Sequence, residues 1–263
     1  MALLWRSTCD GVTYEVRQAG ASRRLYSNGV FHSQWNADRA LAGSLWDLLI
    51  LPGFLPGSRS RLNILVLGVG GGAVIRQALH LLPVDSVTGI ELDPVHIDVA
   101  NRWFGLGAEK RVKLVCADAR EWLSAHTDQR FDLVIDDLFG HFSDDVERSV
   151  ALNAAWARRL LSVACKDAVV VVNTPGDRSA TTALQRLLLS AGGSRKSHGS
   201  AVGFTLSHPA YDNKILALHR QGDTKLKHWR KGWLASLQAS GMNAQQLSVA
   251  AEHLARARRW PSE

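Results

Sequence analysis

Long apolar runs and cysteines are scarce in this sequence, and both absences narrow its class. The longest apolar runs, such as residues 64–67 and 169–172, are far shorter than the roughly 20 residues that a membrane span needs. The three cysteines lie far apart, so the sequence indicates neither a disulfide framework nor a metal site. The first ten residues include Arg6 and Asp10 and lack the continuous apolar segment of a secretory signal. We therefore expect a cytoplasmic protein that binds neither a membrane nor a metal ion.

Acidic residues are the minority charge, with 24 Asp and Glu against 31 Lys and Arg and a net charge of +7. Much of the basic excess lies late in the chain, where Arg256, Arg258 and Arg259 can complement the negative end of a final helix and face water. No basic run is interleaved with aromatic residues, as a surface for single-stranded nucleic acid requires. We therefore expect no nucleic-acid partner.

The sequence pattern changes near residue 57. Residues 12–31 alternate in the manner of β-strands, and Asn28-Gly29 is a strong signal for a type I′ hairpin turn. The apolar spacing of residues 38–51 predicts a helix, which ends where Pro-Gly pairs begin. We therefore assign residues 1–57 to a small β-hairpin module with a linking helix, and residues 58–263 to the main domain.

The main domain alternates apolar strands with segments of helical period, which is typical of a parallel sheet covered on both faces. A helix is expected over residues 148–161, after the fourth strand and a polar loop. The sequence therefore predicts an α/β fold with a mostly parallel, seven-stranded sheet whose last strands are antiparallel. The strands are expected at residues 63–67, 86–90, 112–116, 131–135, 168–172, 201–206 and 214–218.

Ligands of such sheets bind beyond the carboxyl ends of the strands, and this rule selects candidate residues. The first strand runs into a glycine-rich turn, in which Gly68, Gly70 and Gly72 allow the backbone to approach a ligand closely. Glu91 ends the next strand, where a carboxylate can bind both hydroxyls of a ribose. Together these features predict an adenosine-containing ligand and fit NAD as well as other adenosyl compounds.

Asp118, at the end of the third strand, bears on the choice of cofactor. Its carboxylate can accept the exocyclic amine of adenine, and the small Ala119 leaves room for the ring. Asp118 is also well suited to cap the helix that follows. The sequence therefore leaves open whether Asp118 binds adenine or only caps this helix.

Four blocks of sequence resemble the spermidine synthase-like superfamily in order and spacing. They are ILVLGVGGGAVIRQAL (64–79), VTGIELDPVHIDVANRWF (87–104), VKLVCADAREWL (112–123) and FDLVIDDLFG (131–140), and NGVFHSQW (28–35) is similar to the hairpin block of that family. The resemblance covers roughly residues 12–220. It implies a Rossmann-like class I methyltransferase fold, S-adenosylmethionine or its decarboxylated form as cofactor, a small amine acceptor, and a homodimer.

The resemblance also suggests site residues. Asp137 is the first candidate to orient the acceptor nitrogen, and we assign Asp136 to the cofactor. The acceptor is expected to contact His32, Gln34 and His141.

The sequence departs from aminopropyltransferases where the acceptor binds. Gly71 replaces an aspartate in the glycine turn, and only the first aspartate of an Asp-Ser-Ser-Asp-Pro pattern is kept, at Asp137. Leaving a desolvated diamine cation unpaired costs several kcal/mol. The change at Gly71 also opens space and removes a negative charge near the methionine moiety, which suits a ligand that keeps its carboxylate and favours intact S-adenosylmethionine. Methyl and aminopropyl transfer therefore both stay open, as do an inactive nucleoside-binding homologue and an NAD-dependent oxidoreductase.

Overall fold

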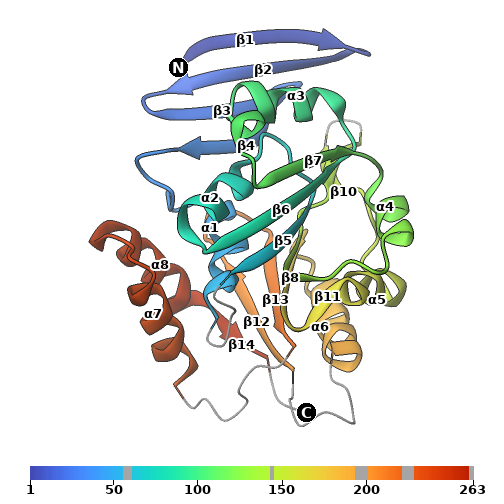
Figure 1. Cartoon of the computed structure of the whole chain (residues 1–263), viewed down its shortest axis with the longest axis vertical. Coiled ribbons are helices and arrows are strands. Elements are labelled where there is room, and N and C mark those ends of the chain that lie inside the picture. The colour runs from blue at the N-terminus through green and yellow to red at the C-terminus, as the bar shows by residue number, and fades with distance from the viewer. Residues whose placement is uncertain (56–60, 143–144, 193–200, 221–227, 261–263) are drawn as a thin grey trace.

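Two β-sheets of different size organise the chain in the computed structural model, which describes residues 1–55, 61–142, 145–192, 201–220 and 228–260 (Figure 1). The smaller sheet is an antiparallel meander at one end of the molecule, with neighbouring strands in sequence order. It is larger than the expected hairpin, because residues 2–9 add a strand that was not expected. Its strands are β1 (Ala2–Cys9), β2 (Val12–Ala19), β3 (Ser22–Ser27) and β4 (Val30–Asn36).

The larger sheet confirms the expected α/β fold. Its strand order is β14-β12-β13-β11-β8-β5-β6-β7, parallel from β11 to β7 and antiparallel at the other end. The sheet has eight strands because the short β14 joins the seven that were predicted. The strands are β5 (Leu62–Leu67), β6 (Val84–Glu91), β7 (Val112–Cys116), β8 (Phe131–Asp136), β11 (Ala164–Thr174), β12 (Val202–Ser207), β13 (Lys214–His219) and β14 (Arg258–Arg259).

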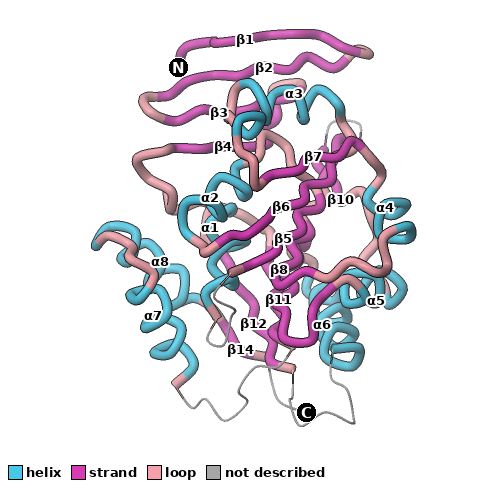
Figure 2. The backbone as a smooth tube through the Cα atoms, in the orientation of Figure 1, coloured by secondary structure: helices cyan, strands magenta, loops and turns pink. Residues whose placement is uncertain are grey.

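Helices cover both faces of this sheet (Figure 2). One apolar cluster joins one face to α1, α2, α7 and α8, and a second joins the other face to α4, α5 and α6. Among the described residues, no helix is both long and apolar enough to cross a membrane. The helices are α1 (Leu45–Ile50), α2 (Ala73–Leu81), α3 (Pro94–Arg102), α4 (Ala119–Ala125), α5 (Ala154–Ser162), α6 (Arg178–Gly192), α7 (Trp229–Ala239) and α8 (Ala244–Arg256), with short 3-10 turns at Leu51–Phe54 and Leu106–Ala108.

Side-chain caps explain where two helices begin later than their apolar periodicity indicated. The helix predicted over residues 38–51 begins at Leu45, because Asp47 accepts hydrogen bonds from the backbone N–H groups of Gly43 and Ser44 and closes a capping box. The helix predicted over residues 148–161 begins only at Ala154, where the Asn153 side chain accepts from the backbone of Trp156.

The segment before α5 forms a hairpin of two short strands, β9 (Phe139–Phe142) and β10 (Asp145–Arg148). Arg148 therefore ends a strand instead of opening a helix.

The strand order reverses between β5 and β8, which places a topological switch point beside the glycine turn. From β5 the chain continues outward to β6 and β7, and β8 then returns to the opposite side of β5. At the carboxyl edge, the Asp137 N–H donates to the Leu67 carbonyl and the Gly68 N–H donates to the Ile90 carbonyl. The residues after β5, β6 and β8 therefore converge at the position where open α/β sheets bind ligands.

Candidate functional site

The glycine turn approaches the end of β8 so closely that a side chain would not fit at its first position. Gly68 has φ +83°, and a Cβ atom there would lie 2.3 Å from the Asp137 carbonyl oxygen. Only glycine combines this backbone conformation with this approach. The turn thereby brings the backbone of Gly68 and the carboxylate of Asp137 to the same edge of the sheet.

Glu91 ends β6 and holds the glycine turn in place. Its Oε2 accepts hydrogen bonds from the N–H groups of Val69 and Gly70, at 2.9 and 2.8 Å, and its Oε1 accepts one from the Asp93 N–H at 3.0 Å. An ionised carboxylate offers about four acceptor positions. Oε1 therefore retains acceptor capacity for a ligand hydroxyl.

His96 lies behind Glu91 on α3. Burial would by itself raise the pKa of Glu91, but the His96 imidazole, with Nδ1 at 3.9 Å, and the backbone donors lower this pKa to about 2. Burial opposes the charged form of His96 in turn, yet the Glu91 and Asp93 carboxylates raise its pKa above the ordinary value. Glu91 is therefore an anion throughout the physiological pH range.

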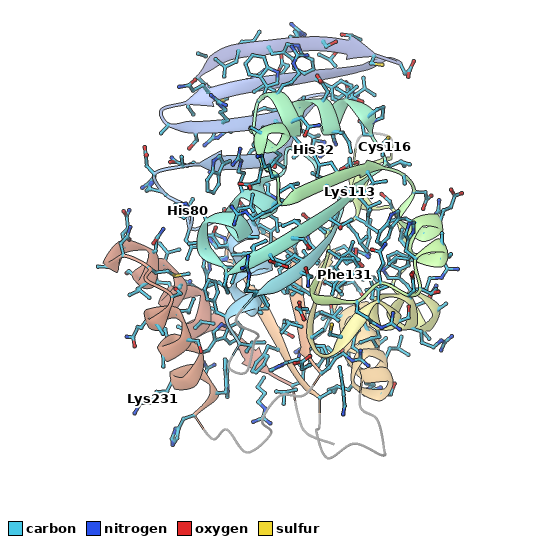
Figure 3. The ribbon with its side chains drawn as sticks, in the orientation of Figure 1. His32, His80, Lys113, Cys116, Phe131 and Lys231 are labelled. Atoms are coloured by element: carbon cyan, nitrogen blue, oxygen red, sulfur yellow. The ribbon has the colours of Figure 1, made fainter. Side chains whose placement is uncertain are left out.

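Two hydrogen bonds attach the N-terminal sheet to this cluster. The Tyr14 hydroxyl donates to Asp93 Oδ2 at 2.7 Å, and Ser27 Oγ lies 3.0 Å from His96 Nε2. His32, on β4, lies between the two sheets (Figure 3), with its ring centroid 5.2 Å from that of His96. The smaller sheet thus supplies one wall of the site.

Asp118 caps α4, which was one of the two roles that its place in the sequence allowed. Its Oδ1 accepts from the Arg120 N–H at 2.7 Å, and the Arg120 guanidinium also pairs with both carboxylate oxygens. The hydrogen bond from the Arg120 side chain lowers the pKa of Asp118. The Arg120 side chain is 59% exposed, so the guanidinium can move away from Asp118 without losing a buried contact.

Two cavities meet at the carboxyl edge of the sheet. The β6–β7 cavity has a volume of ≈ 260 Å³, and the β5–β8 cavity has a volume of ≈ 250 Å³. Both are lined by His32, Gly68, Glu91, His96 and Phe139, so they share a boundary. The β6–β7 cavity is also lined by Val12, Tyr14, Ser27, Ile90, Leu92, Asp93, Ala117, Asp118, Ala119, Arg120, Leu138, Gly140, Ser149 and Val150. The β5–β8 cavity is also lined by Phe31, Ser33, Leu45, Trp46, Val69, Gly70, Ala73, Val74, Asp137, Asn173, Tyr211 and Asn213.

Asp137 lines the β5–β8 cavity and is held by a chain of amides. Asn173 Nδ2 donates to Asp137 Oδ1 at 2.7 Å, and Asn213 Nδ2 donates to Asn173 Oδ1 at 3.0 Å. Burial raises the pKa of the Asp137 carboxyl to about 6, against the opposing hydrogen bond from Asn173. Asp137 is therefore mostly ionised at neutral pH. Its pKa is close enough to neutral pH for the carboxylate to act as a general base.

Several residues expected at the site lie outside the two cavities. Asp136 points to the opposite side of β8, where its fully buried carboxylate accepts from Trp156 Nε1 at 2.7 Å and pairs with Arg148. Gln34 accepts a hydrogen bond from Arg24 Nε at 2.6 Å and lines neither cavity. His141 lies in β9, but its side chain falls outside the described residues.

Two glycines of the turn have packing roles instead of facing a cavity. A Cβ atom at Gly72 would lie 2.4 Å from the Leu106 side chain, and one at Gly71 would lie 2.8 Å from Phe104. The expectation that Gly71 leaves room for a ligand carboxylate is therefore wrong, because Phe104 and Ser33 fill that space.

The site also contains residues that the sequence did not single out. Asn173 was identifiable by the same strand-end rule as a polar residue just after the predicted strand 168–172, and His96 as a polar residue on the helix that follows Glu91. Tyr14 and Asn213 gave no signal, because their places depend on pairings between distant parts of the chain.

Comparisons with known proteins agree with this architecture. Residues 64–160 match a family model described as a methyltransferase domain. A polyamine aminopropyltransferase of Corynebacterium efficiens is 34% identical over 140 residues, which is 51% of this chain and 25% of that protein. The chain thus aligns with about a quarter of the length of that relative.

Solved structures extend the likeness to nearly the whole chain. A probable spermidine synthase from Corynebacterium glutamicum has a TM-score of 0.71 at 17% identity, with 98% of this chain and 90% of that chain covered. A spermidine synthase in complex with the transition-state analogue AdoDATO has a TM-score of 0.63 at 14% identity, with 95% and 88% covered. The chain therefore has a spermidine synthase-like class I methyltransferase fold.

Proposed function

We propose that this protein transfers an alkyl group from an adenosyl sulfonium compound to the nitrogen of a small acceptor. The observation that carries the proposal is the junction of two cavities at Gly68 and Glu91, with the Asp137 carboxylate in the second. This arrangement offers one space for a nucleoside and an adjoining space for the group that is transferred and its acceptor. The family match and the AdoDATO-bound structural neighbour support the same class of reaction.

The residues of the β6–β7 cavity fit an adenosine. Glu91 is anionic and keeps acceptor capacity on Oε1 for ribose hydroxyls. Asp118 can accept a hydrogen bond from the adenine amine if Arg120 moves aside, and the small, apolar side chain of Ala119 leaves room for the ring. Tyr14 is bonded to Asp93, so it closes the cavity on the side of the N-terminal sheet.

Asp137 has the role of positioning the acceptor in this proposal. A sulfonium compound supplies both the alkyl group and a good leaving group, so the protein has to align the acceptor and receive its proton. Asn173 fixes the orientation of the Asp137 carboxylate and leaves Oδ2 without a bond from that amide. The raised pKa of about 6 lets this carboxylate take a proton from an ammonium nitrogen more readily than an ordinary aspartate would.

The charge of the β5–β8 cavity favours aminopropyl over methyl transfer. The described residues that line it include the carboxylates of Glu91 and Asp137 and neither Lys nor Arg. The N–H groups of Val69 and Gly70 already donate to Glu91, so they are not available to the carboxylate of a methionine moiety. An ammonium group therefore suits this cavity better than a carboxylate does, which reverses the preference expected from Gly71.

Calorimetric titration tests the proposal with four ligands: S-adenosylmethionine, its decarboxylated form, methylthioadenosine and NAD. We expect the three sulfur nucleosides to bind and NAD not to bind, with the decarboxylated form tightest. Glu91→Gln should weaken this binding about 10- to 100-fold, because a hydrogen bond to a charged group contributes about 1.5–3 kcal/mol.

Glu121→Gln is the matched control, since Glu121 is exposed on α4 and lines neither cavity. Binding of NAD in preference to every sulfur nucleoside would refute the proposed cofactor. Tighter binding of S-adenosylmethionine than of the decarboxylated form would refute the preference for aminopropyl transfer and leave the cofactor class intact.

A further inference from the structure

A third cavity lies beyond the β5–β8 cavity along the same edge of the sheet. It is an open groove of ≈ 660 Å³ between the loop that joins β12 to β13 and the end of α8, and we call it the basic cavity. Its charged lining residues are Lys214, Asp212, Arg230, Arg256 and Arg258. Four cationic side chains thus accompany one carboxylate, in contrast to the neighbouring cavity, which has carboxylates and no Lys or Arg among its described lining residues.

The order of the strands explains why this cavity continues the site. β13 is antiparallel to β11, so Lys214 at the start of β13 pairs with Thr174 at the end of β11. Ser207 pairs with Lys214, and Thr205 pairs with Arg258 of β14. The basic cavity therefore occupies the edge at which β8 ends in Asp137. Lys214 lies two strands from β8, which corresponds to about 10 Å at the usual strand spacing.

The loop between β12 and β13 separates the two cavities and contacts both. Tyr211 lines the β5–β8 cavity and the basic cavity. Two residues further along, Asn213 donates to Asn173, the residue that orients Asp137. The same loop is packed against Gly176, where a Cβ atom would lie 2.1 Å from the Asp212 carbonyl oxygen. A ligand in one cavity is therefore adjacent to residues that shape the other.

Only part of the positive charge is needed to stabilise the fold. Arg230 donates to the carbonyl oxygens of Leu254 and Ala257 and so caps the end of α8. Arg256 makes one bond, to the Glu252 carbonyl. Across the part of the chain that the structure describes, no carboxylate lies within ion-pairing distance of Lys214 or Arg258. Lys214 and Arg258 therefore have no role in capping α8 and no ion-pair partner among the described residues.

We propose that the basic cavity binds an anionic group of the acceptor, a carboxylate or a phosphate, about 10 Å from the nitrogen that reacts beside Asp137. The proposal rests on the proposed function, because that function places the reacting nitrogen in the β5–β8 cavity. The acceptor is then an amine with an anionic tail instead of a diamine. This assignment also explains how the site works without a second carboxylate after β8, since the far end of such an acceptor needs cations.

Probe compounds of matched length test the proposal. Each is titrated into the protein saturated with S-adenosylhomocysteine: 8-aminooctanoate, 8-aminooctyl phosphate and 1,8-diaminooctane, which share the amine and differ in the charge of the far end. We expect at least one anionic probe to bind about tenfold more tightly than the diamine. The preference should fall below about threefold in a variant with Lys214→Gln and Arg258→Gln, and Arg256→Gln alone should reduce it by a smaller factor.

Lys231→Gln serves as the control, because Lys231 points away from α7 and lines none of the three cavities (Figure 3). It should leave the preference unchanged, and all variants should bind S-adenosylhomocysteine like the unaltered protein. Equal or tighter binding of the diamine would overturn the inference, as would a preference that persists in the double variant. If no sulfur nucleoside binds, the proposed function fails and the acceptor assignment falls with it, whereas nucleoside binding without an anion preference refutes the acceptor assignment alone.

Discussion

Replacing Asp137 with Asn should stabilise the protein while it abolishes transfer. The raised pKa of Asp137, about 6 against an ordinary 3.8, means that the folded protein holds this proton more tightly than the unfolded chain does. Ionisation of Asp137 therefore destabilises the folded protein. This destabilisation is absent below the pKa that Asp137 has in the unfolded chain, and it reaches its full size above the pKa that Asp137 has in the folded protein. One pKa unit corresponds to about 1.4 kcal/mol, so the cost reaches about 3 kcal/mol at pH 8 and about 1.5 kcal/mol at pH 5. Asn is uncharged and can still accept the hydrogen bond from Asn173.

Urea denaturation of both proteins at several pH values between 5 and 8 measures this difference. The variant should be more stable throughout, and its advantage should grow by about 1.5 kcal/mol between pH 5 and pH 8. Affinity for methylthioadenosine should stay the same, since this nucleoside has no charged side chain and Asp137 lies outside the β6–β7 cavity. A destabilised variant, or an advantage that does not change with pH, would contradict the raised pKa of the Asp137 carboxyl.

Three further predictions concern neighbouring residues. Because the pKa of Glu91 is about 2, nucleoside affinity should be constant between pH 5 and 9, and a decline below pH 7 in calorimetric titrations would contradict its role. Asp136→Asn should lower the free energy of unfolding, measured by urea denaturation, by about 3–5 kcal/mol, because it leaves the buried Arg148 without its charge partner. Nucleoside affinity should not change in this variant. Asn173→Ala should raise the pKa of Asp137 further by removing a hydrogen bond that lowers it, so the acid limb of the pH–rate profile should move to higher pH.

Much of the fold was predictable from the sequence because the central strands are buried on both faces. Residues such as Ile64–Leu67 and Val169–Val172 form continuous apolar runs that fix each strand and its carboxyl end. The glycine turn, Glu91 and Asp118 follow from those ends. The N-terminal strand β1 was not predictable in this way, since its residues are exposed or only partly buried and form no continuous buried run.

The remainder of the site depends on contacts between distant segments. Asp136 and Asp137 are adjacent in the sequence, and only the packing of α5 against β8 decides that the first faces Trp156 and the second the cavity. Asn213 meets Asn173 because β13 pairs with β11 in one particular register. The hydrophobic pattern of a strand decides which of its faces is buried, but not which residue of a distant strand lies opposite each of its own residues.

The attachment of the N-terminal sheet has a consequence for protein engineering. Val12, Tyr14, Ser27 and His32 contribute to the wall of the β6–β7 cavity from strands that precede the large sheet. A shortened chain that starts at the glycine-rich half would expose Asp93 and His96 to water and lose the partners that orient them. Chimeras that aim to change substrate choice should therefore exchange the meander and the strand-end loops as one unit.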